Sequence, residues 1–274
     1  MKMVSAAKLR KAQQAITQMR PYVTRLNKIL KNILSSMEGD ATTSYGVARE
    51  EVYPVIVTVT SNRGLCGAFN TNVIKEAIQV VETRFKSQYE AGNLTVLPIG
   101  KKGYDTMKKK YPKANIIADY VTIFNDLSFD NVAVVSQMLM DGFKSGEYDV
   151  IVSCYGRFKN AAMQFSEADQ FLPVEKLEKS SEESKIKADY IFEPDKETLL
   201  ESLIPSILQT KFQKYLLDTH ASEHGARMTA MDKATENASD LIKDLKIKYN
   251  KARQESITSE LSEIVGGAAA LESA

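Results

Sequence analysis

The chain has 274 residues, of which 43% are hydrophobic and 26% are charged, and its formal net charge is +1. This composition excludes disordered and low-complexity proteins and provides enough apolar material for a folded domain with extended elements. No run approaches the roughly 18 apolar residues of a transmembrane helix, and no signal sequence follows Met1, so the sequence predicts a soluble, unexported protein. Two cysteines, Cys66 and Cys154, are too few for a disulfide framework and indicate a reducing compartment.

The first 37 residues are predicted to form a basic amphipathic helix. They contain eight Lys or Arg residues and no acidic residue. Apolar residues recur at spacings of three and four, which places them along one side of a helix. Pro21 is expected to bend or interrupt this helix locally. Because no N-cap residue precedes Val4, the helix is expected to begin upstream of Met1.

Strands and helices alternate in the middle of the chain. Runs of β-branched and apolar residues predict strands over 52–60, 94–99, 116–123 and 150–155. Helical periodicity predicts helices over 70–89, 104–111 and 131–144. Such alternation is typical of a small α/β domain with a largely parallel sheet. The sequence turns polar after Met163, and the segment 175–190 predicts an exposed loop beside an edge strand.

From Lys196 onward a helical pattern continues past Pro205, and no helix-stopping cluster occurs before Gly266. At 1.5 Å per residue, the stretch 206–271 would be about 100 Å long. Each large apolar side chain left in water forgoes about 1.5–3 kcal/mol, so this helix needs a partner. The first helix is the nearest candidate for an antiparallel coiled coil. The last turns extend beyond such a pair and need a socket that another protein supplies.

Five segments of the chain resemble the gamma subunit of the F-type ATP synthase. They are MKMVSAAKLRKAQ at the start, SNRGLCGAFN after the first strand, YIFEPD at 190–195, ASEHGARMTAMDKATENA in the long helix and YNKARQESITSELSEIVGGAAAL at the end. The resemblance covers essentially the whole chain, and the last segment is the most specific. In the family the first helix starts several turns before the position of Met1, so the resemblance implies that the chain is incomplete at its N-terminus.

The resemblance implies an α/β fold in which an antiparallel coiled coil of long N- and C-terminal helices flanks a Rossmann-like domain. It divides the chain into an N-terminal coiled-coil helix (1–45), the Rossmann-like α/β domain (46–195) and a long C-terminal coiled-coil helix (196–274). The same arrangement of terminal helices is expected independently from the apolar periodicity.

By this resemblance the chain is the central rotor shaft, which couples ion-driven rotation of the c-ring to conformational changes in the catalytic beta subunits. The shaft itself is expected to be no enzyme and to carry no cofactor or metal. The implied partners are the alpha, beta and epsilon subunits and the c-ring, through which the chain would be peripheral to a membrane. The implied location is the cytoplasmic face of a bacterial inner membrane.

Three groups of residues match contact positions of the family. The residues matched to the alpha/beta ring are Arg253, Gln254, Ile257, Glu260, Ile264 and Val265. Those matched to the acidic lever of a beta subunit are Met1, Lys2 and Lys8. Those matched to the foot, near the c-ring and the epsilon subunit, are Tyr190, Phe192 and Glu193. Small apolar residues over 266–270 offer contact without directional hydrogen bonds, which suits a tip that turns, whereas a guanidinium and an amide make directional contacts.

One motif follows the first predicted strand. Gly64, Cys66 and Gly67 match neither the G-x-G-x-x-G nor the Walker A pattern, so a tight turn is favoured over a phosphate cradle.

A second motif, H-x-x-E-H, is formed by His220, Glu223 and His224 and is the inverted zinc-protease pattern. No third ligand or cleft is identified, so two exposed or packing histidines are the preferred interpretation.

The basic first helix leaves a second function open, a coiled-coil adaptor that binds nucleic acid or an anionic membrane surface. Tyr22 is the one aromatic residue interleaved with its cations, so this function is the less favoured one.

Overall fold

The computed structural model describes residues 1–36, 44–46, 49–174 and 196–272. The chain divides into two compact units, Met1–Thr229 and Ala230–Ala274. The domain boundaries predicted after residues 45 and 195 remain predictions.

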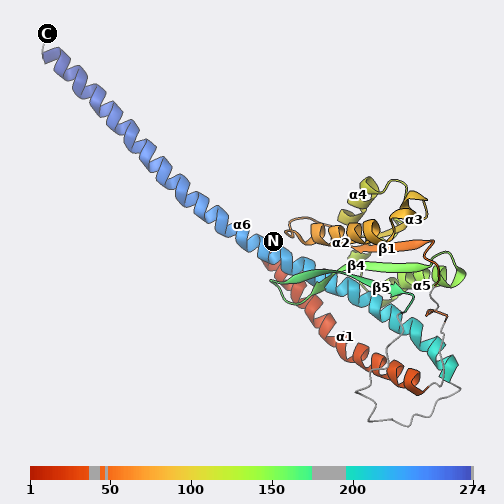
Figure 1. Cartoon of the computed structure of the whole chain (residues 1–274). Helices are drawn as coiled ribbons and strands as arrows, with labels where there is room; N and C mark the ends of the chain where they lie inside the picture. The colour runs from red at the N-terminus through yellow and green to blue at the C-terminus, as the bar shows by residue number, and fades with distance from the viewer. Residues whose placement is uncertain (37–43, 47–48, 175–195, 273–274) are drawn as a thin grey trace. The chain divides into compact units, whose positions relative to one another are not determined.

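A single mixed sheet forms the centre of the first unit. Its strands, within the described residues, are β1 (Pro54–Val59), β2 (Thr95–Ile99), β3 (Asn115–Ile116), β4 (Val150–Phe158) and β5 (Gln164–Leu172). The spatial order is β3-β2-β1-β4-β5 (Figure 1). All neighbouring pairs are parallel except β4 and β5, which are antiparallel. The predicted α/β class with a largely parallel sheet is therefore confirmed.

Helices cover both faces of this sheet. The helices between the strands are α2 (Phe69–Arg84), α3 (Lys86–Glu90), α4 (Lys101–Lys110) and α5 (Phe129–Ser145), with a 3₁₀ turn η1 (Ile123–Asn125) before α5. Because side chains alternate along a strand, Val55 and Val57 of β1 face a core built with α5 and the last long helix. Ile56 faces the opposite core, which α2 and α4 complete. Both faces of β1 are thus buried, as expected for a central parallel strand.

The predicted strand over 116–123 is wrong for most of its length, because β3 ends at Ile116. Ile117, Tyr120 and Ile123 are instead partly buried against the core that contains α5. These residues are apolar because they cover that core. Their burial does not require them to pair as a strand, so the apolar run predicted a strand that is not formed. An edge strand was predicted in this region without bounds, and β5 lies at the edge of the sheet. The loop predicted over 175–190 lies outside the described residues.

Two long helices complete the chain, α1 (Lys2–Ser36) and α6 (Lys196–Glu272, 77 residues). Neither Pro21 in α1 nor Pro205 in α6 interrupts its helix. Within the first unit α1 runs antiparallel to α6 (Figure 1). Their shared apolar cluster contains Leu9, Ala12, Ile16, Leu217 and Ala221. The spacings of three and four on α1 and of four on α6 are those of a coiled-coil seam, and the predicted antiparallel pairing is confirmed.

The second unit is formed by the α6 stretch that begins at Ala230. At 1.5 Å per residue its helical part is about 65 Å long. Searched over the parts of the chain that the structure describes, no helix combines the length and the apolar character that a bilayer crossing requires.

Candidate functional site

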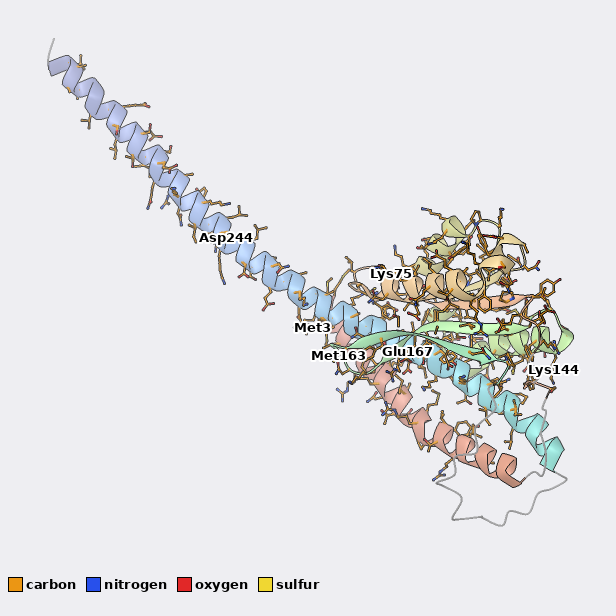
Figure 2. All side chains as sticks on the ribbon, in the orientation of Figure 1. Met3, Lys75, Lys144, Met163, Glu167 and Asp244 are labelled. Atoms are coloured by element: carbon orange, nitrogen blue, oxygen red, sulfur yellow. The ribbon has the colours of Figure 1, made fainter. Side chains whose placement is uncertain are left out.

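The second unit exposes an unusual amount of apolar surface. Every residue from Lys233 to Leu271 is exposed, and Figure 2 shows side chains, Asp244 among them, along both edges of this stretch of α6. The large exposed apolar residues are Leu241, Ile242, Leu245, Ile247, Tyr249, Ile257, Leu261, Ile264, Val265 and Leu271. Contiguous exposed apolar surface marks a site of interaction with another molecule.

A polar window, Asn250–Ser256, separates two apolar groups on this helix. Arg253 and Gln254 lie within the window and are exposed. Neither side chain makes a hydrogen bond or ion pair with another described residue. Arg253, Ile257 and Glu260 follow one another at spacings of four and three, so they share one face of α6.

The tip residues of the predicted site are also exposed. Ile257 is 49% accessible to solvent, and the fractions for Ile264 and Val265 are 68% and 65%. Gly266 and Gly267 are helical, and a side chain added at either would meet no atom within 4 Å. All six residues predicted to contact the alpha/beta ring therefore lie on one exposed helical segment.

The other two predicted groups have different outcomes. Met1 lies at the start of the chain, Lys2 and Lys8 lie on α1, and all three are exposed. The predicted foot residues, Tyr190, Phe192 and Glu193, lie outside the described residues.

The part of α6 in the first unit is enclosed by a socket, which we define as β4 with its hairpin to β5, the loop 61–68 after β1, and α1. On the β4 side, the Gly156 N–H donates to Thr219 Oγ1 at 3.1 Å. Ser222 Oγ donates to the Gly156 carbonyl at 3.1 Å. A Cβ at Gly156 would lie 2.4 Å from the Phe69 ring, so this crossing requires glycine. Thr229 Oγ1 extends the contact by donating to the Ala161 carbonyl at 3.2 Å.

On the loop side, Arg227 joins α6 to loop 61–68. The side chain of Arg227 is almost wholly buried, and its Nη2 donates to the Arg63 carbonyl at 3.1 Å and the Gly64 carbonyl at 3.2 Å. The same nitrogen lies 2.6 Å from Glu223 Oε1. Burial raises the pKa of the Glu223 carboxyl, and the Arg227 guanidinium opposes that rise. A buried ion pair of this kind is costly to break, because removal of one partner leaves the other charged and unpaired.

The two histidines continue this network. Arg227 Nη1 lies 3.2 Å from His224 Nδ1. Because arginine can only donate, Nδ1 accepts and the His224 proton sits on Nε2. That Nε2 lies 3.1 Å from Nε2 of His220, which therefore accepts. The His220 ring also stacks on Phe124 with a centroid distance of 6.1 Å.

Both imidazoles are held neutral. Burial lowers the pKa of His220 to about 4, and Lys8, Arg227 and Lys11 lower it further in the same direction. Burial lowers the pKa of His224 to about 3, with additional effects of His220, Arg227 and Lys8.

The H-x-x-E-H motif therefore serves packing in this network. Glu223 is engaged by Arg227, and the His224 nitrogen that faces His220 carries a proton, so these groups are not arranged as metal ligands. Across the described parts of the chain, no group of three His, Cys, Asp or Glu residues is suited to hold a metal ion. The preferred interpretation of the two histidines as packing residues agrees with this geometry.

The loop after β1 leads into α2, and its bonds are those of a tight turn. Phe69 N–H, at the start of α2, donates to the Cys66 carbonyl at 3.3 Å. Ser61 N–H donates to Asn70 Oδ1 at 2.9 Å, and Leu65 and Gly67 have φ values of 63° and 58°. A helix N-terminus binds phosphate through free amides, so the use of these amides within the protein favours the tight-turn interpretation of this loop.

Asp218 is a second buried carboxyl group in the socket. It is buried where α6 meets α1 and the β4–β5 hairpin, and burial raises its pKa to about 6. Lys214, Arg20 and Arg157 lower that pKa, whereas Glu167 raises it. The sequence pattern did not predict a role for Asp218, Thr219, Ser222 or Arg227. The one signal for such a role is that polar residues occur on every side of this helix.

Comparisons with known proteins agree with these observations. A family model described as ATP synthase matches residues 1–271. The ATP synthase gamma chain of Cytophaga hutchinsonii is 47% identical over 272 residues, which cover 99% of this chain and 92% of that relative. The gamma chain of Flavobacterium psychrophilum is 50% identical over 272 residues, covering 99% of this chain and 91% of that relative.

Solved structures show the same fold. A chain from the central stalk and c-ring structure of Tetrahymena thermophila mitochondrial ATP synthase is 18% identical, with a TM-score of 0.57, and the match covers 85% of this chain and 97% of that chain. A chain from the mitochondrial ATP synthase of Euglena gracilis is 21% identical, with a TM-score of 0.56 and coverage of 97% and 95%. Given the family match and the identities to the bacterial relatives, the chain belongs to the ATP synthase gamma chain family.

Proposed function

We propose that this chain is the central-stalk rotor of an F-type ATP synthase and couples c-ring rotation to ATP synthesis or hydrolysis in the beta subunits. The observation that carries the proposal is the long exposed stretch of α6, whose apolar side chains require a surrounding partner. Family membership supports the alpha/beta ring as that partner. The shaft is a non-catalytic subunit in this proposal, and the beta subunits perform the chemistry.

The exposed helix suits two kinds of contact with the ring. Ile264, Val265 and the small residues that follow offer dispersion contacts, which are weak per atom pair and non-directional. A tip of this kind rotates within the ring against low energy barriers. Arg253 and Gln254 offer directional, partly charge-assisted hydrogen bonds, which favour particular angles. We assign these two residues to the positions at which rotation pauses.

The start of α1 is assigned to the acidic lever of a beta subunit. Lys2 and Lys8 would attract that lever, with about 1 kcal/mol or less for each exposed pair. Most of the push is steric in this proposal, because a stiff shaft presents a different face to each catalytic subunit. The foot contact with the c-ring and the epsilon subunit is assigned to Tyr190, Phe192 and Glu193.

Through the c-ring the chain would be peripheral to a membrane, on the cytoplasmic face in a bacterium. The alternative function, an adaptor for nucleic acid or a membrane surface, gains no support from family membership. Reconstitution of the chain with the alpha and beta subunits of the same organism tests the proposal. We expect a stable complex in which ATP turns a bead attached to the α/β unit, by which we mean the sheet β1–β5 with helices α2–α5. Failure of the three subunits to co-purify, or ATP hydrolysis without rotation, would contradict it.

A further inference from the structure

The socket surrounds α6 completely over three turns. From Tyr215 to Gly225 no residue of α6 is exposed. A helix that is buried on all sides is normally apolar all round, yet this stretch contains Thr219, His220, Ser222 and Glu223. These polar side chains bond to the socket or to each other, so the helix is held by more than apolar packing.

The contacts come from three directions. With 100° of rotation per residue, Leu217, Ala221 and Met228 face α1, whereas Thr219, Ser222 and Thr229 face β4 and its hairpin. Arg227 faces loop 61–68. These three directions are separated by roughly a third of a turn. A helix gripped in this way resists rotation about its own axis.

The three sides do not contribute equally to that resistance. Dispersion contacts with α1 are non-directional, so they oppose separation of the helices more than a small rotation. Hydrogen bonds depend steeply on angle and therefore fix the rotational position of α6. Arg227 has the most such bonds to the socket, because its guanidinium donates to the Arg63 carbonyl once and to the Gly64 carbonyl twice. Its contacts with Glu223 and His224, which lie on α6 itself, hold the plane of the guanidinium.

Loop 61–68 is itself built to meet Arg227. Leu65 has a φ of 63°, in the left-handed region that costs a bulky residue energy, and its side chain is 63% exposed. Apolar burial therefore does not account for this conformation. The carbonyls that Arg227 binds belong to Arg63 and Gly64, directly before the strained residue. The geometry couples the loop conformation to α6.

We propose that Arg227 is the positioning residue that fixes the rotational angle of α6 within the α/β unit and so transmits torque between that unit and the shaft. The torque part of this inference rests on the proposed function. The Glu223 carboxylate and the His224–His220 pair hold the guanidinium in the plane that reaches the loop.

Hydrogen exchange of the isolated full chain tests the connection itself. The variants are Arg227→Ala and Arg227→Lys, of which the second keeps the charge but loses the planar fork. We expect exchange of residues 61–68 to rise about tenfold in both, equivalent to a loss of ~1.4 kcal/mol. Lys75→Ala, which removes an exposed cation from α2, is the charge control and leaves this exchange unchanged. Unchanged exchange at 61–68 in both Arg227 variants would overturn the inference.

A measurement of rotor stiffness in the assembled complex tests the role in torque. A bead is attached to the α/β unit, and its angular variance is recorded while the complex is stalled with bound nucleotide. The loss of one of three equal holding directions would raise the variance to about one and a half times its original value. Because Arg227 makes the most bonds to the socket, Arg227→Lys should raise the variance by at least this factor. ATP hydrolysis should stay near the original rate, because the ring contacts the exposed part of α6.

Leu94→Ala separates stiffness from stability. Leu94 is fully buried in the core that α2 and α4 complete, which contains no residue of α6, so its truncation destabilises the unit without touching the helix or Arg227. We expect a lower melting temperature and an unchanged angular variance. Equal variances in Arg227→Lys and the unmodified chain would refute the torque role. If the unmodified chain does not assemble with alpha and beta subunits, the proposed function fails and the torque role with it, whereas the exchange result still decides whether Arg227 holds the loop.

Discussion

The Nε2 atoms of His220 and His224 lie 3.1 Å apart on successive turns of α6, and Arg227 determines which of them carries a proton. The guanidinium can only donate to His224, so the hydrogen bond between the rings has a fixed direction. Protonation of either ring would add a donor where an acceptor is needed. The network therefore requires both imidazoles to be neutral.

This requirement predicts that acid destabilises the first unit. The pKa values in the folded chain, about 4 for His220 and about 3 for His224, lie below the ordinary value of 6.5. Between these limits the unfolded chain binds more protons, so the free energy of unfolding decreases as the pH falls from 6.5 towards 4. Urea titrations of the isolated chain at pH 7 and pH 4.5 would measure the decrease. The double variant His220→Gln/His224→Gln should show a smaller pH dependence, and an identical slope would count against this role of the pair.

Asp218 should have the opposite pH dependence. Its pKa in the folded chain is about 6, above the ordinary value of 3.8, because it is buried. The folded chain therefore binds more protons between these values, and stability contributed at low pH is lost as the pH rises through 6. A shift of two pKa units corresponds to about 3 kcal/mol at most.

Asp218→Asn should remove this loss, so at pH 8 the variant should be about 1–3 kcal/mol more stable than the unmodified chain. At pH 4 the difference should largely vanish. Chemical denaturation at both pH values checks the prediction, with the exposed Asp105→Asn as the control. A variant that is less stable at pH 8 would show instead that Lys214, Arg20 and Arg157 need this carboxylate as a partner.

Periodicity alone predicted the long helices and most strands, because these elements have continuous apolar patterns with clear periods. It failed over 116–123, where Ile117 and Ile123 are apolar because they cover a core that the sequence does not reveal. It also gave no bounds for β5, the expected edge strand, since an edge strand with one solvated face tolerates polar residues such as Glu167 (Figure 2).

The socket lies beyond sequence reasoning for a different reason. Arg227 and Ser222 bond to backbone carbonyls of Arg63, Gly64 and Gly156, and a carbonyl acceptor imposes no particular side chain. The H-x-x-E-H pattern even suggested a metal site, because helical spacing shows which residues share a face but not what lies opposite them. The exposure of the residues around Arg253 was easier to predict. When one helix of a coiled coil is much longer than its partner, the part that extends beyond the partner is exposed.

Gly156→Ala should weaken the socket from the β4 side. The added methyl would lie 2.4 Å from Phe69 Cε2 and 3.5 Å from Ser222 Cβ, so the ring or α6 must move. Overpacking of this kind costs about 1–3 kcal/mol. Urea denaturation measures the cost, and Gly67→Asn is the comparison, because Gly67 has open space and a left-handed φ of 58° that asparagine tolerates. Equal stability of Gly156→Ala and the unmodified chain would show that the crossing adapts.

Gly266→Ala and Gly267→Ala should stabilise the end of α6 in the isolated chain. Both glycines are helical and exposed, and a Cβ at either position meets nothing within 4 Å. Alanine is favoured over glycine in a helix interior by about 1 kcal/mol. Slower amide exchange over 262–270 would confirm this expectation. In the assembled complex ATP turnover should change little, since a methyl group adds only non-directional contacts to the tip; a large loss would argue against a smooth apolar bearing.

Arg253→Ala and Gln254→Ala should leave the free chain unchanged but slow the assembled motor. In the free chain both side chains are exposed and bond to no described residue, so their removal should alter stability by less than about 0.5 kcal/mol. In the complex, loss of a hydrogen bond to a charged group costs about 1.5–3 kcal/mol, which corresponds to at least a tenfold lower rate if the bond forms in the rate-limiting state. Steady-state ATP hydrolysis with alpha and beta subunits measures the effect.

Lys248→Ala, on a different face of the same exposed helix, is the matched control, because it removes a cation without touching the polar window. If the Arg253 and Gln254 variants both retain full ATP turnover, these residues do not set the angles at which the shaft pauses.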